Sequence, residues 1–515
     1  MRLDRLLRSV AVSRIVLPTG VQAGAAEPQE SARDLDVRSV HCRSQNVSAG
    51  GLFVAVKGFS ADGHDFIDDA VARGAVAVVT ERPAAAKVPL VVVDDSRRAL
   101  ARISAEFFGR PARRLVMAGV TGTNGKTTTV WLLEGIFKKA GLNTGAIGTI
   151  GYRYGGRIFD NPVTTPESID LQRVLAAMAD SGVTHVAMEV SSHGLALHRI
   201  EGCPLDVGIF TNLSQDHLDF HGSMDAYWEC KKTLFSRHLG PENPKPERTA
   251  VINVDDPRGA ALAAEIPGRV ITTGTSGSCQ VRAESATLRR RGIRAELVTA
   301  AGRTPIESAL VGSHNLANIL SAAGAAAALK IPLSAIAEGI ASVARIPGRL
   351  EAVQGTKRRF VFVDYAHTPD ALANVLTALR EISRGRLICL FGCGGDRDRG
   401  KRPQMGAIAA QMSDLAIVTS DNPRNEDPMD IIEEICAGIE PLGKKRHEPA
   451  DLASGFTEAG YTVAPDRRIA IELAEACSAE HDTVLIAGKG HETYQIIGNQ
   501  RLDFDDRKEA MRVFS

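Results

Sequence analysis

A glycine-rich segment ending in lysine and threonine is the stretch of this sequence best equipped for chemistry. It reads Val120-Thr121-Gly122-Thr123-Asn124-Gly125-Lys126-Thr127-Thr128. Glycines let backbone N–H groups close on anionic oxygens, a lysine adds a positive charge, and a threonine hydroxyl can reach Mg²⁺. Val120 stands where the general phosphate-loop pattern has its first glycine, and a glycine turn with an incidental lysine is the alternative. Because glycine, lysine and threonine come together at a predicted helix start, we favour an ATP site. Its predicted contacts are Gly122, Thr123, Asn124, Gly125, Lys126, Thr127 and Thr128.

Acidic and imidazole side chains follow two further predicted strands. Glu189 comes directly after the apolar run 184–188, and His217 lies in a polar segment after the run 207–211. The carboxyl ends of parallel strands meet at one edge of a sheet, the edge that here also carries the phosphate loop. Glu189 could therefore hold Mg²⁺ or cap a helix, and His217 could bind the metal or order its loop. Beside a nucleotide site we favour the metal for Glu189.

These side chains need a parallel sheet to position them, and the sequence predicts one. An apolar run at 115–118 precedes the phosphate loop, and helix-periodic residues follow it at 130–137. Strands alternate with helices on both sides, which indicates an α/β architecture. Thr165 suits a helix N-cap and Pro166 the first helical position, while the short runs of 280–310 predict antiparallel hairpins. Further strands are predicted at 52–56, 75–79, 89–94, 360–364, 387–391, 415–419 and 483–487, and further helices at 98–108, 169–178, 225–236 and 314–329.

The length of the chain requires more than one domain. With 515 residues and about 100–200 residues per domain, we expect three or so. Pro111 with the basic pair Arg113-Arg114 marks one boundary, and the segment 346–349 marks the other. We predict a small N-terminal α/β domain at 1–112 and a central phosphate-loop ATPase domain with a parallel sheet at 113–345. A C-terminal Rossmann-like α/β domain is predicted at 346–515.

Charge balance and hydropathy exclude several classes of function. Basic and acidic residues both number 61, so no net field attracts nucleic acid or an anionic membrane. No apolar run is long enough to span a membrane. The eight cysteines are scattered and lack zinc spacing, which favours reduced thiols in a cytosolic protein. We interpret the arginine-rich residues 1–26 as an ordinary domain start rather than a transit peptide, and predict a cytoplasmic location.

The phosphate loop is one of a series of polar segments that can be compared with known families. The others lie at 188–194, 216–219, 312–318, 347–351 and 363–370. Three more read Gly392-Cys393-Gly394-Gly395-Asp396-Arg397-Asp398, Asp421-Asn422-Pro423-Arg424 and Gly488-Lys489-Gly490-His491-Glu492. Taken in this order, the series resembles the Mur ligases of peptidoglycan synthesis over nearly the whole chain. The last three segments resemble most the branch of that family that adds meso-diaminopimelate.

By this resemblance the protein would be an ATP-dependent ligase that adds meso-diaminopimelate to UDP-N-acetylmuramoyl-L-alanyl-D-glutamate through an acyl phosphate. The N-terminal domain would hold the uridine end of the substrate, the central domain ATP and Mg²⁺, and the C-terminal domain the amino acid. The enzyme is expected to act as a monomer on these small molecules, without nucleic acid.

The resemblance also gives meaning to a lysine pair that would otherwise indicate a solvated helix face. The family's carbamylated lysine matches Lys231, next to Lys232. A carbamate turns an ammonium group into an anionic oxygen ligand for a second Mg²⁺. The implied catalytic residues are Lys126, Glu189, His217 and Lys231. The implied metal ligands are Thr127, Glu189, His217 and the carbamate of Lys231.

Further binding residues are carried over position by position. Additional nucleotide contacts match Asn315, Asn318, Arg349 and Asp364. Contacts to the UDP-muramyl dipeptide match Ser44, Phe59, Ser60, Ala61, Thr164, Thr165, Ser191 and Arg199. Contacts to meso-diaminopimelate match Arg397, Asp421, Asn422, Pro423, Arg424, Gly488 and Glu492. The chain departs from the family where Arg43-Ser44-Gln45 replaces Asp-Ser-Arg and where Leu197 replaces a glutamine of some members, which concerns affinity for the muramyl substrate.

Three alternative functions remain open from the sequence. A related Mur ligase could add another amino acid such as L-lysine. A folylpolyglutamate-synthetase-like ligase would share the phosphate loop, but the segment 421–424 argues against it. A nucleotide-regulated scaffold with a degenerate site is disfavoured because Lys126, Glu189, His217 and Lys231 are all present.

Overall fold

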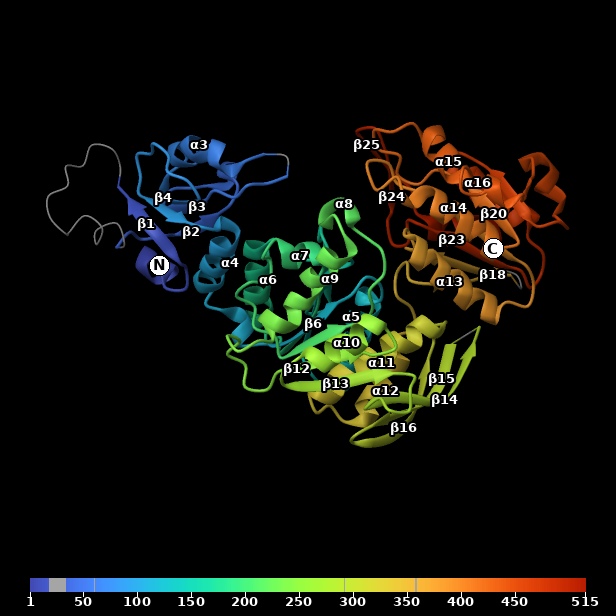
Figure 1. Ribbon diagram of the computed structural model, residues 1–515, viewed down its shortest axis with the longest axis horizontal. Helices are drawn as coiled ribbons and strands as arrows, with labels where there is room; N and C mark the ends of the chain where they lie inside the picture. Colours follow the sequence, from blue (N-terminus) through green and yellow to red (C-terminus); the bar gives the residue numbers. More distant parts are fainter. Residues whose placement is uncertain (18–33, 60, 291, 357–358) are drawn as a thin grey trace. The chain divides into compact units, whose positions relative to one another are not determined.

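The computed structural model describes residues 1–17, 34–59, 61–290, 292–356 and 359–515. They form two compact units, both built from alternating strands and helices (Figure 1). The first unit comprises Met1–Thr121, Leu142–Gly208 and Cys230–Thr249, and the second comprises Gly122–Gly141, Ile209–Glu229 and Ala250–Ser515. The α/β class predicted from the sequence is confirmed. The domain boundaries at 112/113 and 345/346 stay predictions.

The first unit begins with a five-stranded sheet in the order β1-β5-β4-β3-β2. Its strands are β1 (Val12–Val16), β2 (Ser39–His41), β3 (Gly51–Val54), β4 (Ala75–Thr80) and β5 (Leu90–Val93), and β1 alone among them pairs antiparallel. Leu52 and Val54 pack with helices α1 (Leu3–Leu7) and α4 (Ser96–Phe107), whereas Phe53 packs with α3 (Ile67–Ala72) on the other face. Helix α4 begins two residues before its predicted start, because Asp95 accepts a hydrogen bond from the backbone N–H of Arg98 (2.8 Å).

The same unit holds the strand that leads into the phosphate loop. Strand β6 (Val116–Thr121) pairs parallel with β10 (His185–Glu189), which pairs parallel with β7 (Thr144–Gly148). Antiparallel strands β8 (Gly151–Tyr154) and β9 (Arg157–Phe159) extend this sheet. Glu189 lies opposite Val120, so its carboxylate leaves the sheet at the edge where the loop begins, as predicted. Helices α6 (Ser168–Asp180) and α7 (Ser192–Ala196) flank β10 in the chain.

One predicted helix start is wrong. Helix α6 begins at Ser168, and its N-cap is Glu167, whose carboxylate accepts from the N–H of Ser168 (2.9 Å). Thr165 is buried, and its hydroxyl donates to the backbone oxygen of Glu189 (2.9 Å). Because that tertiary contact occupies the hydroxyl, Thr165 is not the cap and Pro166 is not the first helical residue.

The second unit starts with helix α5 (Lys126–Lys139), which follows the phosphate loop. It packs against α11 (Ser313–Ala328) and α12 (Leu333–Ser342); a Cβ at Gly339 would overlap the backbone of Ile136. The antiparallel hairpins predicted for 280–310 are confirmed as β14 (Val281–Arg289), β15 (Gly292–Thr299) and β16 (Gly302–Ser308). The second unit also holds α8 (Leu218–His221), α10 (Pro257–Glu265) and β13 (Arg269–Gly274). The π-helical segment η4 (Leu234–His238) belongs to the first unit, and β11 (Val207–Phe210), α9 (Met224–Thr233) and β12 (Thr249–Asn253) contain residues of both units.

A seven-stranded sheet forms the C-terminal part of this unit, in the order β17-β18-β23-β19-β20-β22-β21. Its strands are β17 (Glu351–Ala352), β18 (Phe360–Asp364), β19 (Leu387–Phe391), β20 (Leu415–Val418), β21 (Lys445–Arg446), β22 (Gly460–Val463) and β23 (Thr483–Ala487). All pairs except β17–β18 are parallel. One face packs against α13 (Pro369–Ile382), α14 (Lys401–Met412) and α15 (Pro428–Cys436), and the other against α16 (Arg467–Cys477) and α17 (Asp506–Phe514). Figure 1 shows this layered arrangement in orange and red, with the separate hairpin β24 (Tyr494–Ile497) and β25 (Gln500–Asp503) at its edge.

Two further observations concern the helices and the cysteines. In the described part of the chain no helix is both long and apolar enough to cross a membrane. All eight cysteines are free, and most are buried. Burial raises the pKa of the Cys203 thiol to about 12, which keeps it protonated.

Candidate active site

The two glycines of the phosphate loop occupy positions that no other residue fits. Gly122 has φ +149° and Gly125 has φ +85°. A Cβ at Gly122 would overlap the hydroxyl of Thr211, and one at Gly125 would overlap the side-chain oxygen of Asn318. The loop therefore needs glycine for space as well as for backbone conformation. Gly125 is the N-cap of α5, so the loop ends at a helix N-terminus, where backbone dipoles favour an anion.

The segment after β11 anchors this loop. Asn212 accepts from the N–H of Thr123 through its backbone oxygen (2.9 Å) and from the N–H of Asn124 through its side-chain oxygen (2.9 Å). The hydroxyl of Thr123 accepts from the N–H of Ser214 (3.0 Å), and Thr211 donates to the backbone oxygen of Asn124 (2.6 Å). Thr123 and Asn124 thus shape the loop through these bonds, and their predicted contact with ATP stays a prediction.

The ammonium group of Lys126 lies across the loop, where it donates to the backbone oxygens of Gly122 (2.9 Å) and Thr123 (2.8 Å). Its positive charge also lowers the pKa of Asp216. Burial alone would raise the pKa of Asp216, but His217, His367, Lys126 and Lys401 together lower it. The mouth of the loop therefore holds an ionised carboxylate near the ammonium groups of Lys126 and Lys401. Asp216 also lies 3.3 Å from Nε2 of His217, which fits the loop-ordering role of this histidine and leaves its metal role untested.

Several predicted nucleotide residues meet beside the loop. The guanidinium of Arg349 donates to the hydroxyl of Thr127 (3.2 Å) and lies 4.7 Å over the ring of Tyr365. Asn318, next to Gly125, donates to the side-chain oxygen of Asn315 (3.2 Å). The structure thus brings Thr127, Arg349, Asn315 and Asn318 to the phosphate loop. Thr128 is buried in the first turn of α5.

Asp364 has a different setting. Its carboxylate accepts from the N–H groups of Leu350 (2.6 Å) and Ala366 (2.7 Å), and so shapes the chain around Arg349. Burial raises the pKa of Asp364, against the lowering effect of Arg349. Its predicted contact with the nucleotide stays a prediction.

In the first unit, Glu189 is buried at the end of β10. Its two carboxylate oxygens accept from the N–H (2.9 Å) and the hydroxyl (3.1 Å) of Thr149. The hydroxyl of Thr149 also lies 3.1 Å from that of Thr164. The helix that follows is capped by Ser191, which accepts from the N–H of Gly194 (3.0 Å). The helix-cap interpretation of Glu189 is therefore wrong.

Four residues predicted to contact the muramyl substrate gather around this strand end. The hydroxyl of Thr165 lies 3.1 Å from that of Ser191, and Arg199 donates to the backbone oxygen of Thr165 (3.0 Å). Thr164 joins them through Thr149. Glu167 lies 3.7 Å from Arg199 and holds its charge in place, although burial lowers the pKa of this arginine. The four form one polar wall beside Glu189.

The other predicted muramyl contacts lie apart from this wall in the chain. Ser44 is buried in a short 3₁₀ turn, where its hydrogen bond to Asp69 helps to lower the pKa of that carboxyl. Phe59 is 74% exposed and Ala61 is also exposed. Ser60 lies outside the described residues.

Lys231 differs sharply from its neighbour. Its side chain is 1% exposed on α9, whereas Lys232 is half-buried. A charged side chain is almost never fully buried without specific partners. The solvated-face interpretation is therefore wrong for Lys231. Its burial favours Lys231 over Lys232 as the match to the family's carbamylated lysine.

The predicted amino-acid contacts of the C-terminal part form a connected network. Asn422 donates to Glu492 (2.9 Å), and Lys489 donates to Asn422 (3.0 Å) and Asp421 (3.3 Å). Burial, and then the nearby Asp421, raises the pKa of Glu492. Gly488, with φ +114°, lies close to Asp421; a Cβ there would be 3.0 Å from its carboxylate. Sequence reasoning missed Lys489, which is fully buried between the two acids. The available signal was a lysine between two glycines directly after an apolar strand.

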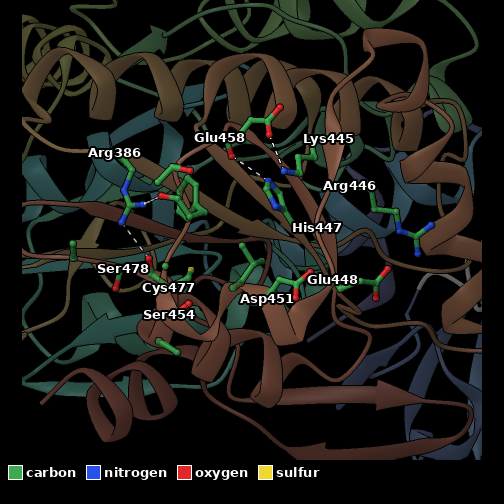
Figure 2. Close-up of a pocket in the computed structure, with 16 residues that line it drawn as sticks. Arg386, Lys445, Arg446, His447, Glu448, Asp451, Ser454, Glu458, Cys477 and Ser478 are labelled. Carbon is green, nitrogen blue, oxygen red and sulfur yellow. Dashed lines mark hydrogen bonds and ion pairs between the residues drawn. The ribbon is translucent and has the colours of Figure 1, made fainter.

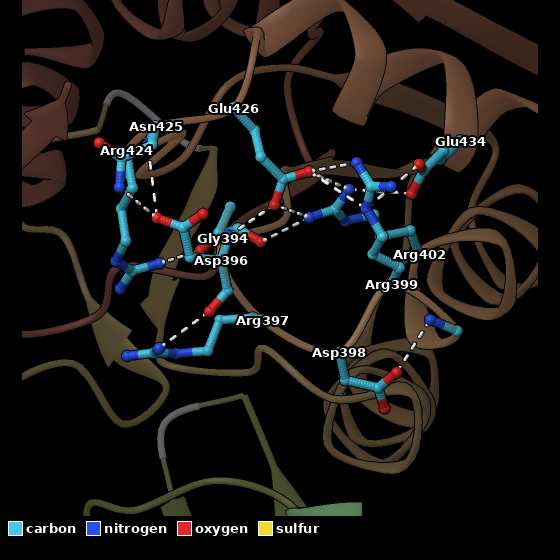
Figure 3. A network of polar contacts seen from close by, with 12 residues as sticks. Gly394, Asp396, Arg397, Asp398, Arg399, Arg402, Arg424, Asn425, Glu426 and Glu434 are labelled. Atoms are coloured by element: carbon cyan, nitrogen blue, oxygen red, sulfur yellow. Dashed lines mark hydrogen bonds and ion pairs between the residues drawn. The ribbon is translucent and has the colours of Figure 1, made fainter. Parts of the chain in front are cut away.

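Figure 3 shows four arginines, Arg397, Arg399, Arg402 and Arg424, which fall into two pairs. Arg399 and Arg402 form ion pairs with Glu426 and Glu434. Arg397 donates to the backbone oxygen of Asp396 (3.0 Å) and Arg424 to that of Gly395 (2.7 Å). Among the described residues, neither Arg397 nor Arg424 forms an ion pair. Their predicted contacts with meso-diaminopimelate stay predictions.

A cavity of about 610 Å³ lies at the opposite, amino-terminal side of β22 and β23 (Figure 2). None of the predicted site residues lines it. Its charged groups are largely engaged with their surroundings: Lys445 pairs with Glu458 (2.7 Å), and Arg386 bonds Asp482 (2.6 Å) and stacks on Phe456. This cavity offers no convergent set of groups for a ligand.

Comparison with known families matches three consecutive segments of the chain. Residues 36–108 match a model described as Mur ligase family, catalytic domain. Residues 120–326 match the Mur ligase middle domain, and residues 348–490 match the Mur ligase glutamate ligase domain.

Curated relatives cover almost the entire chain. A UDP-N-acetylmuramoyl-L-alanyl-D-glutamate–2,6-diaminopimelate ligase of Geobacter metallireducens is 49% identical over 93% of this chain and 94% of its own length. A protein of the same name from Geobacter sulfurreducens is 45% identical over 99% of both chains.

Solved structures show the same three-domain α/β fold. A structure named as a UDP-N-acetylmuramoyl-L-alanyl-D-glutamate–2,6-diaminopimelate ligase covers 100% of this chain and 98% of its own, with a TM-score of 0.67 and 30% identity. Two others are alike in fold alone. MurF ligase from Thermotoga maritima in complex with ADP is 20% identical (TM-score 0.62, covering 93% and 98% of the two chains). Folylpolyglutamate synthase from Mycobacterium tuberculosis is 20% identical (TM-score 0.61, covering 76% and 92%).

Proposed function

Because this chain belongs to the Mur ligase family, we propose that it joins meso-diaminopimelate to UDP-N-acetylmuramoyl-L-alanyl-D-glutamate with hydrolysis of ATP. Relatives of 49% and 45% identity carry the name of a 2,6-diaminopimelate ligase. The folylpolyglutamate synthase alternative has 20% identity and covers 76% of the chain. The predicted membership of the Mur ligase family is confirmed. The identity of the substrates is proposed.

The proposed reaction has two steps. The γ-phosphoryl group of ATP passes to the γ-carboxylate of D-glutamate, which gives an acyl phosphate and ADP. The amine of meso-diaminopimelate then attacks the acyl carbon, and the tetrahedral intermediate expels phosphate as the amide forms. Neither step needs a covalent bond to the protein, so the chain has to bring the partners together and stabilise the transferred charge.

The residues of the phosphate loop suit the first step. The helix N-terminus at Gly125 would hold the phosphates, and Lys126 would exchange its bonds to backbone oxygens for bonds to phosphate oxygens. Arg349, which already lies beside Thr127, would place a second cation there. The wall of Thr164, Thr165, Ser191 and Arg199 would bind the muramyl peptide next to Glu189.

The residues present fit magnesium ions. Within the described ranges no three His, Cys, Asp or Glu side chains converge as a metal cage. Mg²⁺ is commonly held by one or two carboxylates together with phosphates and water, so a lone buried carboxylate such as Glu189 is a suitable donor. Thr127, Glu189, His217 and a carbamylated Lys231 would hold the ions. When bound, the ions would neutralise charge on the transferred phosphoryl group.

One observation carries the choice of amino acid. Arg397 and Arg424 have no acidic partner among the described residues, and Arg424 lies in the same loop as the buried Asp421, which shares Lys489 with the half-buried Glu492. The distal end of meso-diaminopimelate carries a carboxylate and an ammonium group. A planar guanidinium binds the first bidentately, and an acid binds the second. L-lysine lacks that carboxylate and would leave the arginines without a partner.

The proposal is tested by ADP formation with purified full-length protein. ATP, the muramyl dipeptide nucleotide and meso-diaminopimelate should all be required, and L-lysine should be used at least about 10⁴-fold less well, because a site built for a charged group rejects analogues that lack it. Equal use of L-lysine would assign the protein to another branch of the family. ADP formation that does not depend on the amino acid would contradict the ligase activity. Action as a cytoplasmic monomer is part of the proposal, and size-exclusion chromatography with light scattering tests the monomer.

A further inference from the structure

An arginine that is not among the predicted site residues is fully buried and bonds the loops that carry Arg397 and Arg424 (Figure 3). Arg402 stands in the first turn of α14, and its side chain is 0% exposed. Its guanidinium donates to both carboxylate oxygens of Glu426 (2.8 and 2.9 Å), to Glu434 (2.9 Å) and to the backbone oxygen of Gly394 (3.3 Å). One side chain thus bonds three segments: the loop after β19, the loop after β20, and helix α15.

Glu426 is the other centre of this network. Besides Arg402 it binds the guanidinium of Arg399 (2.8 Å) and the N–H of Asp396 (2.5 Å). These bonds, with that of Arg402 first among them, lower the pKa of Glu426 far below its usual range. Its carboxylate is therefore ionised at every pH at which the protein would act, and the ion pair with Arg402 persists.

Further hydrogen bonds join the same two loops, the one after β19 and the one after β20. The N–H of Gly395 donates to the backbone oxygen of Asn422 (2.9 Å), and Asn425 donates to the carboxylate of Asp396 (2.8 Å). Arg424 itself donates to the backbone oxygen of Gly395 (2.7 Å). A change in the position of one loop therefore moves the other, and with it both Arg397 and Arg424.

The chemistry of the contact requires a guanidinium. Arg402 makes four hydrogen bonds to three acceptor groups in fixed directions, which a planar fork of donors can satisfy. A lysine has three donors on one nitrogen and could keep the charge but not bridge the same groups. Removing one partner of a buried ion pair also leaves the other charge uncompensated.

We propose that Arg402 is a positioning residue that sets recognition of the incoming amino acid. It fixes the two loops in one relative position, in which Arg397 and Arg424 face the same carboxylate. Arg402 does not touch the substrate. The inference rests on the proposed function, because it concerns the site assigned there to meso-diaminopimelate.

The test is Arg402→Lys, with KM measured separately for each of the three substrates. The KM for meso-diaminopimelate should rise about 10- to 100-fold, the effect known for residues that orient metal ligands without touching the metal. The KM values for ATP and the muramyl nucleotide should change less than about twofold. Arg386→Lys is the matched control: Arg386 also bonds an acid and backbone oxygens, but beside the cavity of Figure 2, away from both loops. It should lower Tm without altering any KM.

A second variant keeps the inference testable if Arg402→Lys does not fold. Glu434→Gln removes one acidic partner from the surface of α15, where the side chain is 35% exposed, and should raise the KM for meso-diaminopimelate about 3- to 10-fold. Equal changes in all three KM values, the same KM change in Arg386→Lys, or an unchanged KM in Glu434→Gln would overturn the inference. If the unmodified enzyme uses another amino acid, the proposed substrate is wrong, and the same comparison with the amino acid that it does use decides the role of Arg402.

Discussion

Replacing Arg424 with alanine should remove most of the enzyme's preference for meso-diaminopimelate over L-lysine. Arg424 has φ +54°, a strained conformation for arginine and alanine alike, so the backbone contribution nearly cancels in this substitution. Among the described residues its side chain makes one hydrogen bond, to the backbone oxygen of Gly395. The two loops keep their other bonds, through Arg402, Asn425 and the N–H of Gly395, when it is removed. The main loss is therefore that of the contact with the substrate carboxylate.

Breaking a desolvated charge pair costs about 2–5 kcal/mol. At about 1.36 kcal/mol per factor of ten, kcat/KM for meso-diaminopimelate should fall about 30- to 5,000-fold. The value for L-lysine, which has no distal carboxylate, should change less than about threefold.

The assay is steady-state phosphate release with each amino acid, for the unmodified protein and the variant. Arg501→Ala serves as a control, since Arg501 stacks on Tyr494 at 3.8 Å and its loss removes a nearby positive charge from another element. If Arg424→Ala kept the full preference, or if Arg501→Ala reduced it equally, a specific contact of Arg424 with the distal carboxylate would be refuted.

Three further predictions concern other parts of the molecule. Lys126→Ala should abolish ligation with an unchanged Tm, because the ammonium bonds loop carbonyls and not the core; activity close to normal would contradict the ATP site. Lys231→Ala should be inactive and partly rescued by a short carboxylic acid, and an intact mass without an added CO₂ in active enzyme would contradict the carbamate. Finally, burial lowers the pKa of His314 to about 4, so the folded protein binds this proton less readily than the unfolded chain, whose histidine has its usual pKa near 6.5. The resulting stability is present above pH 6.5 and decreases as the pH falls towards 4, by up to about 3 kcal/mol; thermal melts of His314→Asn should show a flatter pH dependence, and an unchanged slope would contradict this account.

Much of the fold could be predicted because its strands are apolar runs bounded by turns. Strands β10, β18, β19 and β23 were predicted to within one residue for that reason, and β6 to within three. Strand β22 has only four residues, one of them glycine, and β25 is exposed along its whole length, so neither carries a hydrophobic pattern. The start of α6 was missed because the hydroxyl of Thr165 bonds a distant strand, which no local pattern records.

Site residues could be predicted where the residue type alone indicates the chemistry. They could not be predicted where the role depends on how deeply the side chain is buried. Gly122, Gly125 and Lys126 follow from a pattern, and their geometry agrees with it. The burial of Lys231 and Lys489 could not be read from neighbours that are polar or glycine. Arg402 pairs with Glu426, whereas Arg424 has no acidic partner in the described part of the chain, and this difference depends on loop geometry that sequence spacing does not encode.

The hydrogen bonds of the phosphate loop to the C-terminal part limit how far this protein can be taken apart. Asn124 donates to Asp370 in the first turn of α13 (2.9 Å), and Arg349 donates to Thr127. The family segments 120–326 and 348–490 follow one another along the chain and look like separable modules. A fragment ending at residue 345 would nevertheless contain the whole phosphate loop and lack two of the groups bonded to it. Swapping C-terminal parts between relatives to change the amino acid should therefore also change the affinity for ATP, unless the residues at 349 and 370 are kept.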